Sequence, residues 1–252
     1  MSPLTENALI YDDNCPLCSA YTTAFVKGGL LQKEGRISFS EVNMQQFSID
    51  WNKARHEIPL INLQTGEVSY GVEALVNILS QKWRWIKPLL EVKMVSLFFK
   101  WLYKLISYNR KIIAASKHTN DNGFDCTPDY SFFWRLMLII ITFSLSAYLF
   151  DKAIVLLCNS YHFNIPALNV LYWRWLPLMA TALTKKKKAT DIIAHLGITL
   201  LFAGAICLCI VKLLHYFWAP PFLLCLYLLL LAVISIKQVQ KRIDAIKSTV
   251  YS

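Results

Sequence analysis

Two cysteines near the start of the chain, Cys15 and Cys18, have a spacing that suits reversible disulfide chemistry. The apolar run at residues 8–11 predicts a short buried strand, residues 12–14 predict a turn, and Pro16 suits the first position of a helix. Cys15 should therefore lie where a helix begins, so that backbone N–H groups and the helix dipole favour its thiolate, with Cys18 one turn further along the same face. We expect Cys15 to be the attacking, more exposed sulfur. Cys18 would be the resolving thiol, which closes the internal disulfide and releases a mixed-disulfide partner.

Two other interpretations of this pair remain open. A Cys-x-x-Cys pair is also half of a zinc site, which needs two more ligands, and the candidates in the soluble part, Cys126, His56 and His118, are not paired. The two thiols could also be unrelated buried cysteines, because cysteine is often buried and inert. Redox chemistry is the favoured interpretation, and no metal site is predicted.

The segments after the cysteines predict a small α/β domain around the pair. Apolar spacing and turn residues predict, in order, a helix at 19–26, a strand at 36–42, a hairpin with strands at 58–63 and 68–70, and a helix at 71–79. The first strand, the helix and the second strand form the right-handed crossover expected for a parallel pair. The Cys pair is therefore expected at the end of the first strand.

The motif from Tyr11 to Cys18 resembles the start of the DCC family of thiol-disulfide oxidoreductases, a thioredoxin-like group named for its Asp-Cys-Cys signature, carried here by Asp12, Cys15 and Cys18. The resemblance extends from about residue 7 to about residue 117. It implies a thioredoxin-like fold and exchange with a disulfide- or thiol-bearing protein or a small-thiol substrate. Such exchange needs no bound cofactor.

Particular positions carry this resemblance further. Asp12 is expected to assist proton transfer or to fix the turn, and Tyr108-Asn109-Arg110 is similar to the family's closing motif. A glycine usually follows the Asp in this family, whereas this chain has Asp13. A second carboxylate near Cys15 is expected to oppose thiolate formation.

Ile58 and Pro59 are the expected substrate-binding residues by the same resemblance. In thioredoxin-like proteins a proline at this point is cis and lies opposite the Cys pair. The Ile58 backbone would then hold an extended substrate segment, and Pro59 would keep competing groups away from Cys15. An ordinary trans proline at the start of a strand is the alternative, because cis is the minority form of any X-Pro bond.

The chain becomes strongly apolar after about residue 130, and 56% of all its residues are hydrophobic. We expect a thioredoxin-like α/β domain at 1–117, a linker at 118–131 and an all-α transmembrane region at 132–252. The expected membrane helices, about four, lie near 132–150, 165–183, 189–211 and 217–236.

Basic residues set the expected orientation. The first dozen residues lack a long apolar core, so we expect no signal peptide and a cytosolic N-terminal domain. The net charge of +10 could indicate nucleic acid, but lysines gather beside apolar segments, as at 185–188, and no nucleic-acid partner is expected. The predicted location is the cell (inner) membrane, multi-pass, with the lipid bilayer as a partner and both the N-terminal domain and the C-terminus in the cytosol.

Residues 83–116 interleave aromatic side chains with lysine and arginine. This pattern fits an amphipathic helix on the cytosolic membrane surface, and it also fits a helix that packs on the α/β core. The favoured function is a membrane-anchored thiol-disulfide oxidoreductase. The alternatives are a membrane-bound scaffold with inactive cysteines and, with less support, a transporter or channel.

Overall fold

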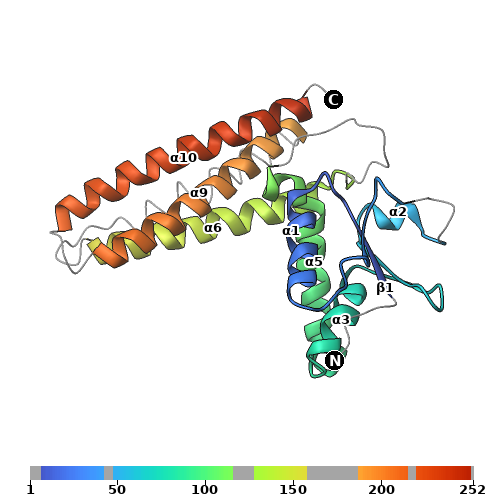
Figure 1. The fold of residues 1–252 in the computed structure, drawn as a ribbon. Helices are drawn as coiled ribbons and strands as arrows, with labels where there is room; N and C mark the ends of the chain where they lie inside the picture. The colour runs from blue at the N-terminus through green and yellow to red at the C-terminus, as the bar shows by residue number, and fades with distance from the viewer. Residues whose placement is uncertain (1–6, 43–47, 116–127, 158–186, 215–219, 251–252) are drawn as a thin grey trace. The chain divides into compact units, whose positions relative to one another are not determined.

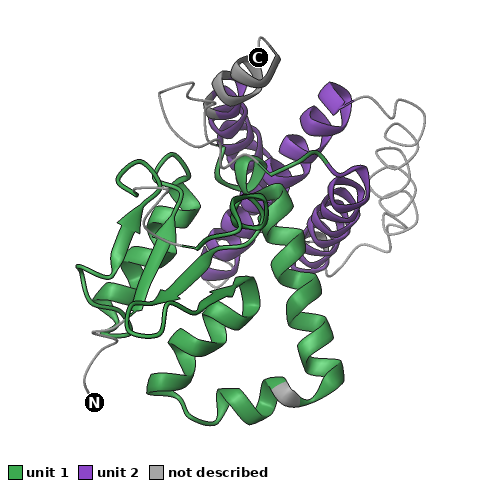
Figure 2. Cartoon of the chain, turned by 90° about the vertical axis from the view of Figure 1, so that its right-hand side faces the viewer, with its two compact units in different colours: residues 1–130 green, residues 131–252 purple. Residues whose placement is uncertain are grey.

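The computed structural model describes residues 7–42, 48–115, 128–157, 187–214 and 220–250. The chain divides into two compact units, residues 1–130 and residues 131–252 (Figure 2). Each unit has its own packing, and the predicted cysteine motif lies in the first.

Unit 1 contains a four-stranded mixed sheet in the order β2-β1-β3-β4. Its strands are β1 (Asn7–Tyr11), β2 (Arg36–Ser38), β3 (Pro59–Asn62) and β4 (Val68–Tyr70). β1 pairs with β2 in parallel and with β3 antiparallel, and β3 and β4 form the predicted hairpin. The parallel pair and the hairpin are therefore confirmed. β2 is shorter than the predicted 36–42 because the Glu41 N–H donates to the Ser38 carbonyl and closes a turn there.

The described helices of unit 1 alternate with the strands and then follow them along the chain. They are α1 (Pro16–Lys27), α2 (Trp51–Ala54), α3 (Gly71–Lys82), α4 (Ile86–Glu91) and α5 (Lys93–Ala114). α1 and α3 confirm the two predicted helices. α1 ends at Lys27 and is followed by Gly28, its C-cap, and by Gly29, whose φ of 67° suits glycine best.

Apolar side chains cover both faces of the sheet. Leu9 and Leu60 face a cluster that includes side chains from α1, α3 and α5, whereas Ala8, Ile10 and Ile61 face a cluster that includes α2. Alternate residues of β1 thus enter different clusters, as the two-residue period of a strand requires. A small mixed sheet with helices packed on it is consistent with the expected thioredoxin-like fold.

Helix α5 has two different halves. Its C-terminal half is buried at Leu105, Asn109 and Ile112, and α5 packs beside α1 (Figure 1). The segment from residue 83 to residue 99 instead exposes a set of large apolar side chains: Trp83, Trp85, Leu89, Val92, Met94, Leu97, Phe98 and Phe99. Ile106, further along α5, is also exposed. Packing on the core is therefore confirmed for the second half, and an exposed apolar and basic face is present on the first.

Unit 2 is mostly helical where it is described. Its helices are α6 (Phe132–Leu157), α9 (Lys187–Leu214) and α10 (Pro220–Val250), which pack against one another as long rods (Figure 1). Two stretches, Phe132–Ala153 and Lys187–Leu214, are long and apolar enough to cross a membrane by length and composition. They correspond to the first and third expected spans.

The expectation of about four spans is met only in part. The apolar part of α10, Cys225–Gln240, is shorter than the two stretches above. The described part of the fourth expected span, 220–236, is therefore one section of a longer helix whose later turns are polar. The second expected span, at 165–183, lies outside the described residues.

Two polar contacts link the three helices that the structure describes in unit 2. Arg135 of α6 forms an ion pair with Asp191 of α9, with 2.9 Å between Nε and Oδ1. His195 of α9 and Arg242 of α10 are joined by a contact of 3.0 Å between Nδ1 and Nη1. Both pairs are buried, and buried charges in such helices are stable only when they are paired. Asp191 and His195 are four residues apart on α9 and so lie on one face of it, and the structure gives each an arginine partner.

Candidate active site at the start of helix α1

Cys15 is the N-cap residue of α1, and Pro16 is the first residue of that helix. The turn before it is held by Asp12, whose backbone carbonyl accepts from the Cys15 N–H at 3.2 Å and whose Oδ1 accepts from the Asn14 N–H at 3.0 Å. The predicted strand, turn and helix start are therefore confirmed. Of the two roles predicted for Asp12, fixing the turn is visible in these bonds.

Both cysteines are reduced and buried, with exposed fractions of 1% for Cys15 and 3% for Cys18. The expectation that Cys15 is the more exposed sulfur is therefore wrong. The reason is tertiary: the C-terminal half of α5 packs beside α1 and places Arg110 against the motif. A helix start is usually open to solvent, but here another helix covers it.

The two thiols have opposite acidities. The hydrogen bond from the Cys18 thiol lowers the pKa of Cys15 from an ordinary 9.0 to about 7, and the Arg110 charge also lowers it, against the opposing effect of burial. The same hydrogen bond and burial raise the pKa of Cys18 far above its ordinary range. Cys15 is thus the thiolate and Cys18 the protonated partner, which is the division of labour expected for attacking and resolving sulfurs.

Arg110 is the principal site residue that motif spacing did not assign. Its Nη1 lies 3.9 Å from the Cys18 sulfur, and its Nη2 lies 3.4 Å from Oδ2 of Asp12. Nη2 also donates to the carbonyl of Arg55 at 3.3 Å. The similarity of Tyr108-Asn109-Arg110 to a family motif marked this residue, but its chemistry depends on a contact between residues 92 apart in sequence.

The carboxylate that opposes the Cys15 thiolate is Asp12 and not Asp13. The negative charge of Asp12 raises the pKa of Cys15, and burial raises the pKa of Asp12 itself even though Arg110 acts to lower it. Asp13 instead accepts a hydrogen bond from the Ser40 hydroxyl at the surface, with a distance of 3.0 Å. The effect expected of Asp13, which is to raise the pKa of Cys15, is therefore found at Asp12.

Pro59 begins β3 and Ile58 immediately precedes it, but the Ile58 backbone is already engaged. The Ile58 N–H donates to the Tyr103 hydroxyl at 2.9 Å, and the Ile58 carbonyl accepts from the Gly71 N–H at 3.0 Å. The described residues contain no cis peptide bond, so the Ile58–Pro59 bond is trans and the cis expectation is wrong. Pro59 lacks an N–H, and as the first residue of a strand it fits in the trans form. Substrate binding by these two residues stays a prediction, and an extended substrate would have to displace Tyr103.

His56 has partners that belong to the fold. Its Nε2 lies 3.1 Å from Oδ2 of Asp129, and its ring stacks on Tyr108 with 5.1 Å between centroids. The other two residues considered for zinc, Cys126 and His118, lie outside the described residues. Within the described ranges no group of three or more His, Cys, Asp or Glu side chains is placed to hold a metal ion.

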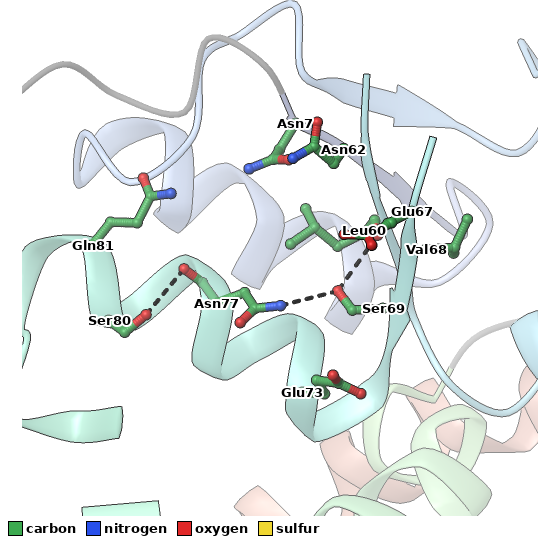
Figure 3. A pocket seen from close by; sticks show the side chains of 10 residues that line it. All are labelled: Asn7, Leu60, Asn62, Glu67, Val68, Ser69, Glu73, Asn77, Ser80 and Gln81. Carbon is green, nitrogen blue, oxygen red and sulfur yellow. Dashed lines mark hydrogen bonds between the residues drawn. The ribbon is translucent and has the colours of Figure 1, made fainter. Parts of the chain in front are cut away.

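A wide groove of about 680 Å³ lies beside β3, β4 and α3 (Figure 3). Figure 3 shows that polar side chains surround it and that Asn77 donates to Ser69 at 3.3 Å, while Ser69 donates to the Leu60 carbonyl at 3.5 Å. Amides, hydroxyls and two glutamates line this groove, and no cysteine does. The groove is therefore separate from the thiol chemistry.

Comparison with known proteins gives one match, and it covers the part of the chain that contains the Cys15–Cys18 pair. No curated protein and no solved structure matches it. A family model does match, over the residues that include the sheet, the Cys15–Cys18 pair and Arg110. Residues 9–115 match the family of DCC1-like thiol-disulfide oxidoreductases.

Proposed function

We propose that this chain is a membrane-anchored thiol-disulfide oxidoreductase that exchanges disulfides through Cys15 and Cys18 on the cytosolic side of the membrane. The observation that carries the proposal is the pairing of a Cys15 thiolate, with a pKa of about 7, with a protonated Cys18 at the start of α1. The family match over residues 9–115 supports the same activity.

The reaction follows from these protonation states. The Cys15 thiolate attacks one sulfur of a substrate disulfide, so that a mixed disulfide forms and the first substrate thiolate leaves. The Cys18 sulfur then attacks the Cys15 sulfur, the second substrate thiolate leaves, and the proton of Cys18 passes to Asp12 or to the leaving sulfur. The substrate is reduced to two thiols, the pair is oxidised to a disulfide, and a thiol reductant restores it.

Membrane anchoring rests on unit 2 and on the exposed face of α4 and α5. Two helices of unit 2 have the length and composition of membrane spans. The exposed face combines Trp85, Phe98 and Leu97 with exposed lysines such as Lys93 and Lys100, a combination that suits an anionic lipid surface. Placing the basic residues beside the spans in the cytosol follows the positive-inside rule.

The first test is the pH dependence of alkylation at Cys15 in the full chain, followed by mass spectrometry of the peptide that contains it. We expect the rate to rise with pH around a midpoint of about 7 and to level off above it, because the thiolate is the reacting species. In Cys18→Ala the midpoint should rise, because the largest cause of the lowered pKa is removed. A mild oxidant should convert the pair to a disulfide that a thiol reverses.

The competing function is a membrane-bound scaffold whose cysteines take no part in exchange. It predicts that Cys15 titrates like a free thiol, near 8.5, and that no reversible Cys15–Cys18 disulfide forms. The alkylation midpoint of Cys15 and the presence or absence of a reversible disulfide therefore distinguish the two functions.

A further inference from the structure

An apolar cavity of about 280 Å³ opens beside the redox pair, and Cys18 is part of its wall. Leu17, Phe25, Leu75 and Ile106 supply much of its lining. The polar members of the wall are Cys18 itself, Arg110, Ser107 and two tyrosines. A mostly apolar space with a few convergent polar groups is typical of a small-molecule site, and its volume is close to the lower end of the usual range of about 300–1,000 Å³.

A second apolar cavity, of about 330 Å³, adjoins the first. The two cavities share Leu75, Tyr103 and Ile106 in their walls. The second cavity is also lined by Trp85 and Phe99, which are 63% and 41% exposed. The exposed apolar face of α4 and α5 is therefore joined to the Cys18 sulfur by a series of apolar side chains.

Burial of the sulfurs restricts what can react with them. Cys15 and Cys18 are at most 3% exposed, so a folded protein cannot bring its disulfide to either sulfur without opening the site. The backbone N–H of Ile58, which would pair with an extended peptide, is bonded to Tyr103. A small molecule in the cavity lies against Cys18 without opening the site, and the Cys18 thiol is hydrogen-bonded to the Cys15 sulfur.

We propose that the substrate of the Cys15–Cys18 pair is a small disulfide with an apolar body, which binds in the cavity beside Cys18 and enters past Trp85 and Phe99. This inference rests on the proposed function and names its substrate class. The atoms balance: a disulfide RSSR, the Cys15 thiolate, the Cys18 thiol and one proton from solvent give two RSH and the Cys15–Cys18 disulfide. The R groups remain in apolar surroundings while the sulfurs exchange.

The test uses the reduced full chain in lipid nanodiscs and two disulfides that have the same number of non-hydrogen atoms. Dipropyl disulfide is apolar, whereas bis(2-hydroxyethyl) disulfide carries two hydroxyls that the apolar wall leaves without partners. The measurement is the second-order rate of Cys15–Cys18 disulfide formation, divided by the rate of each reagent with dithiothreitol in the same nanodiscs. We expect dipropyl disulfide to react at least about tenfold faster, since burying unpaired hydroxyls is costly.

A variant that fills the cavity adds the structural test. Ile106 lines both cavities and is 40% exposed, so Ile106→Trp should narrow the path, and the preference for dipropyl disulfide should fall at least about fivefold. The matched control is Leu63→Trp, which adds the same side chain at an exposed position outside both cavities and should leave the preference unchanged. If Ile106→Trp does not fold, as judged by its Cys15 alkylation midpoint, Leu75→Phe replaces it.

The outcomes separate the two proposals. If neither disulfide oxidises the pair but a mild oxidant does, the substrate class fails and the oxidoreductase function stands. If the mild oxidant also forms no Cys15–Cys18 disulfide, both proposals fail. If both react at equal normalised rates, or if the filled variant keeps the full preference, the cavity is not the substrate site and the oxidoreductase function stands.

Discussion

At the residue scale, the Cys15 sulfur is governed by three neighbours with different effects. Cys18 donates a hydrogen bond that lowers its pKa, Arg110 adds a positive charge that also lowers it, and Asp12 adds a negative charge that raises it. Arg110 and Asp12 also pair with each other at 3.4 Å. The pKa of Cys15 therefore depends on one hydrogen bond and two buried charges, and each of the three residues can be substituted separately.

Replacing Arg110 by methionine should raise the pKa of Cys15 above about 7, because a stabilising positive charge is lost. A rise of about one unit, at the low end of the effect of a close opposite charge, would reduce the thiolate fraction at pH 7 about fivefold. The alkylation midpoint of Cys15 measures this shift. Arg110→Lys keeps a charge and should shift the midpoint less. An unchanged midpoint in Arg110→Met would show that this arginine has no electrostatic role at the sulfur.

Replacing Asp12 by asparagine separates its two predicted roles. Asn can still accept the Asn14 N–H bond, so the turn should persist. Loss of the negative charge should move the alkylation midpoint of Cys15 below about 7. If Asp12 takes the Cys18 proton, closure of the internal disulfide should nevertheless slow by about tenfold or more, as loss of a general base predicts. Rapid mixing with a mixed disulfide at Cys15 measures closure, and an unchanged rate would restrict Asp12 to the turn.

At the element scale, α5 connects the sheet to the site. The Tyr103 hydroxyl accepts from the N–H of Ile58, just before β3. Arg110 contacts Cys18 in α1 and Asp12 before it, and both side chains line the cavity at Cys18. One helix thus shapes the thiol environment, the start of β3 and the proposed substrate space.

Gly71, with a φ of 58°, allows the chain to turn into α3 close to the Tyr103 ring.

Tyr103→Phe should lower the free energy of unfolding by about 1–3 kcal/mol, because the partly buried Ile58 N–H loses its acceptor. Tyr70→Phe is the matched control, since the Tyr70 hydroxyl also accepts from a backbone N–H, that of Asp50, but at an exposed position. Loss of the Tyr70 hydroxyl should lower the free energy of unfolding by less, because water can then accept from the exposed Asp50 N–H. Denaturant unfolding of the full chain in detergent micelles compares the two variants. Equal decreases in the free energy of unfolding would show that burial of the Ile58–Tyr103 hydrogen bond does not increase its contribution to stability.

At the scale of the whole molecule, a small α/β unit that carries the Cys15–Cys18 pair and a mostly helical unit share one chain. Unit 1 has its own two-sided sheet core, and unit 2 has α6, α9 and α10 packed together. An apolar substrate makes physical sense in such a protein, because apolar disulfides concentrate in lipid and the exposed face of α4 and α5 has the composition of a lipid contact.

The full chain should stay with the membrane pellet after alkaline carbonate extraction, because two helices have the length of membrane spans. Epitope tags at the two termini should both be cleaved by protease in sealed inside-out vesicles and protected in right-side-out vesicles. This result follows from the positive-inside rule for the basic residues beside the spans. Release by carbonate would contradict anchoring, and cleavage of one tag in each preparation would contradict an even number of spans.

Local sequence determined much of this protein. Alternating apolar residues, Pro16 and the glycines after α1 define the strand, the helix start and the helix end, because these features depend on residues a few positions apart. The hairpin of β3 and β4 and the helix α3 were predictable for the same reason. The position of Cys15 at a helix N-terminus, and of Cys18 one turn later, is already contained in the motif.

Tertiary structure decided the properties of the site. Burial of Cys15, the contact of Arg110 with Cys18 and the bond from Ile58 to Tyr103 all depend on the packing of α5 against α1 and on its contact with Ile58. Those partners are 45 and 92 residues apart, and no local pattern specifies such a distance. The sequence by itself therefore determined which residues could exchange disulfides. Only the packed structure decided how acidic the thiol is and which space leads to it, because charge and burial at a sulfur come from distant parts of the chain that folding brings together.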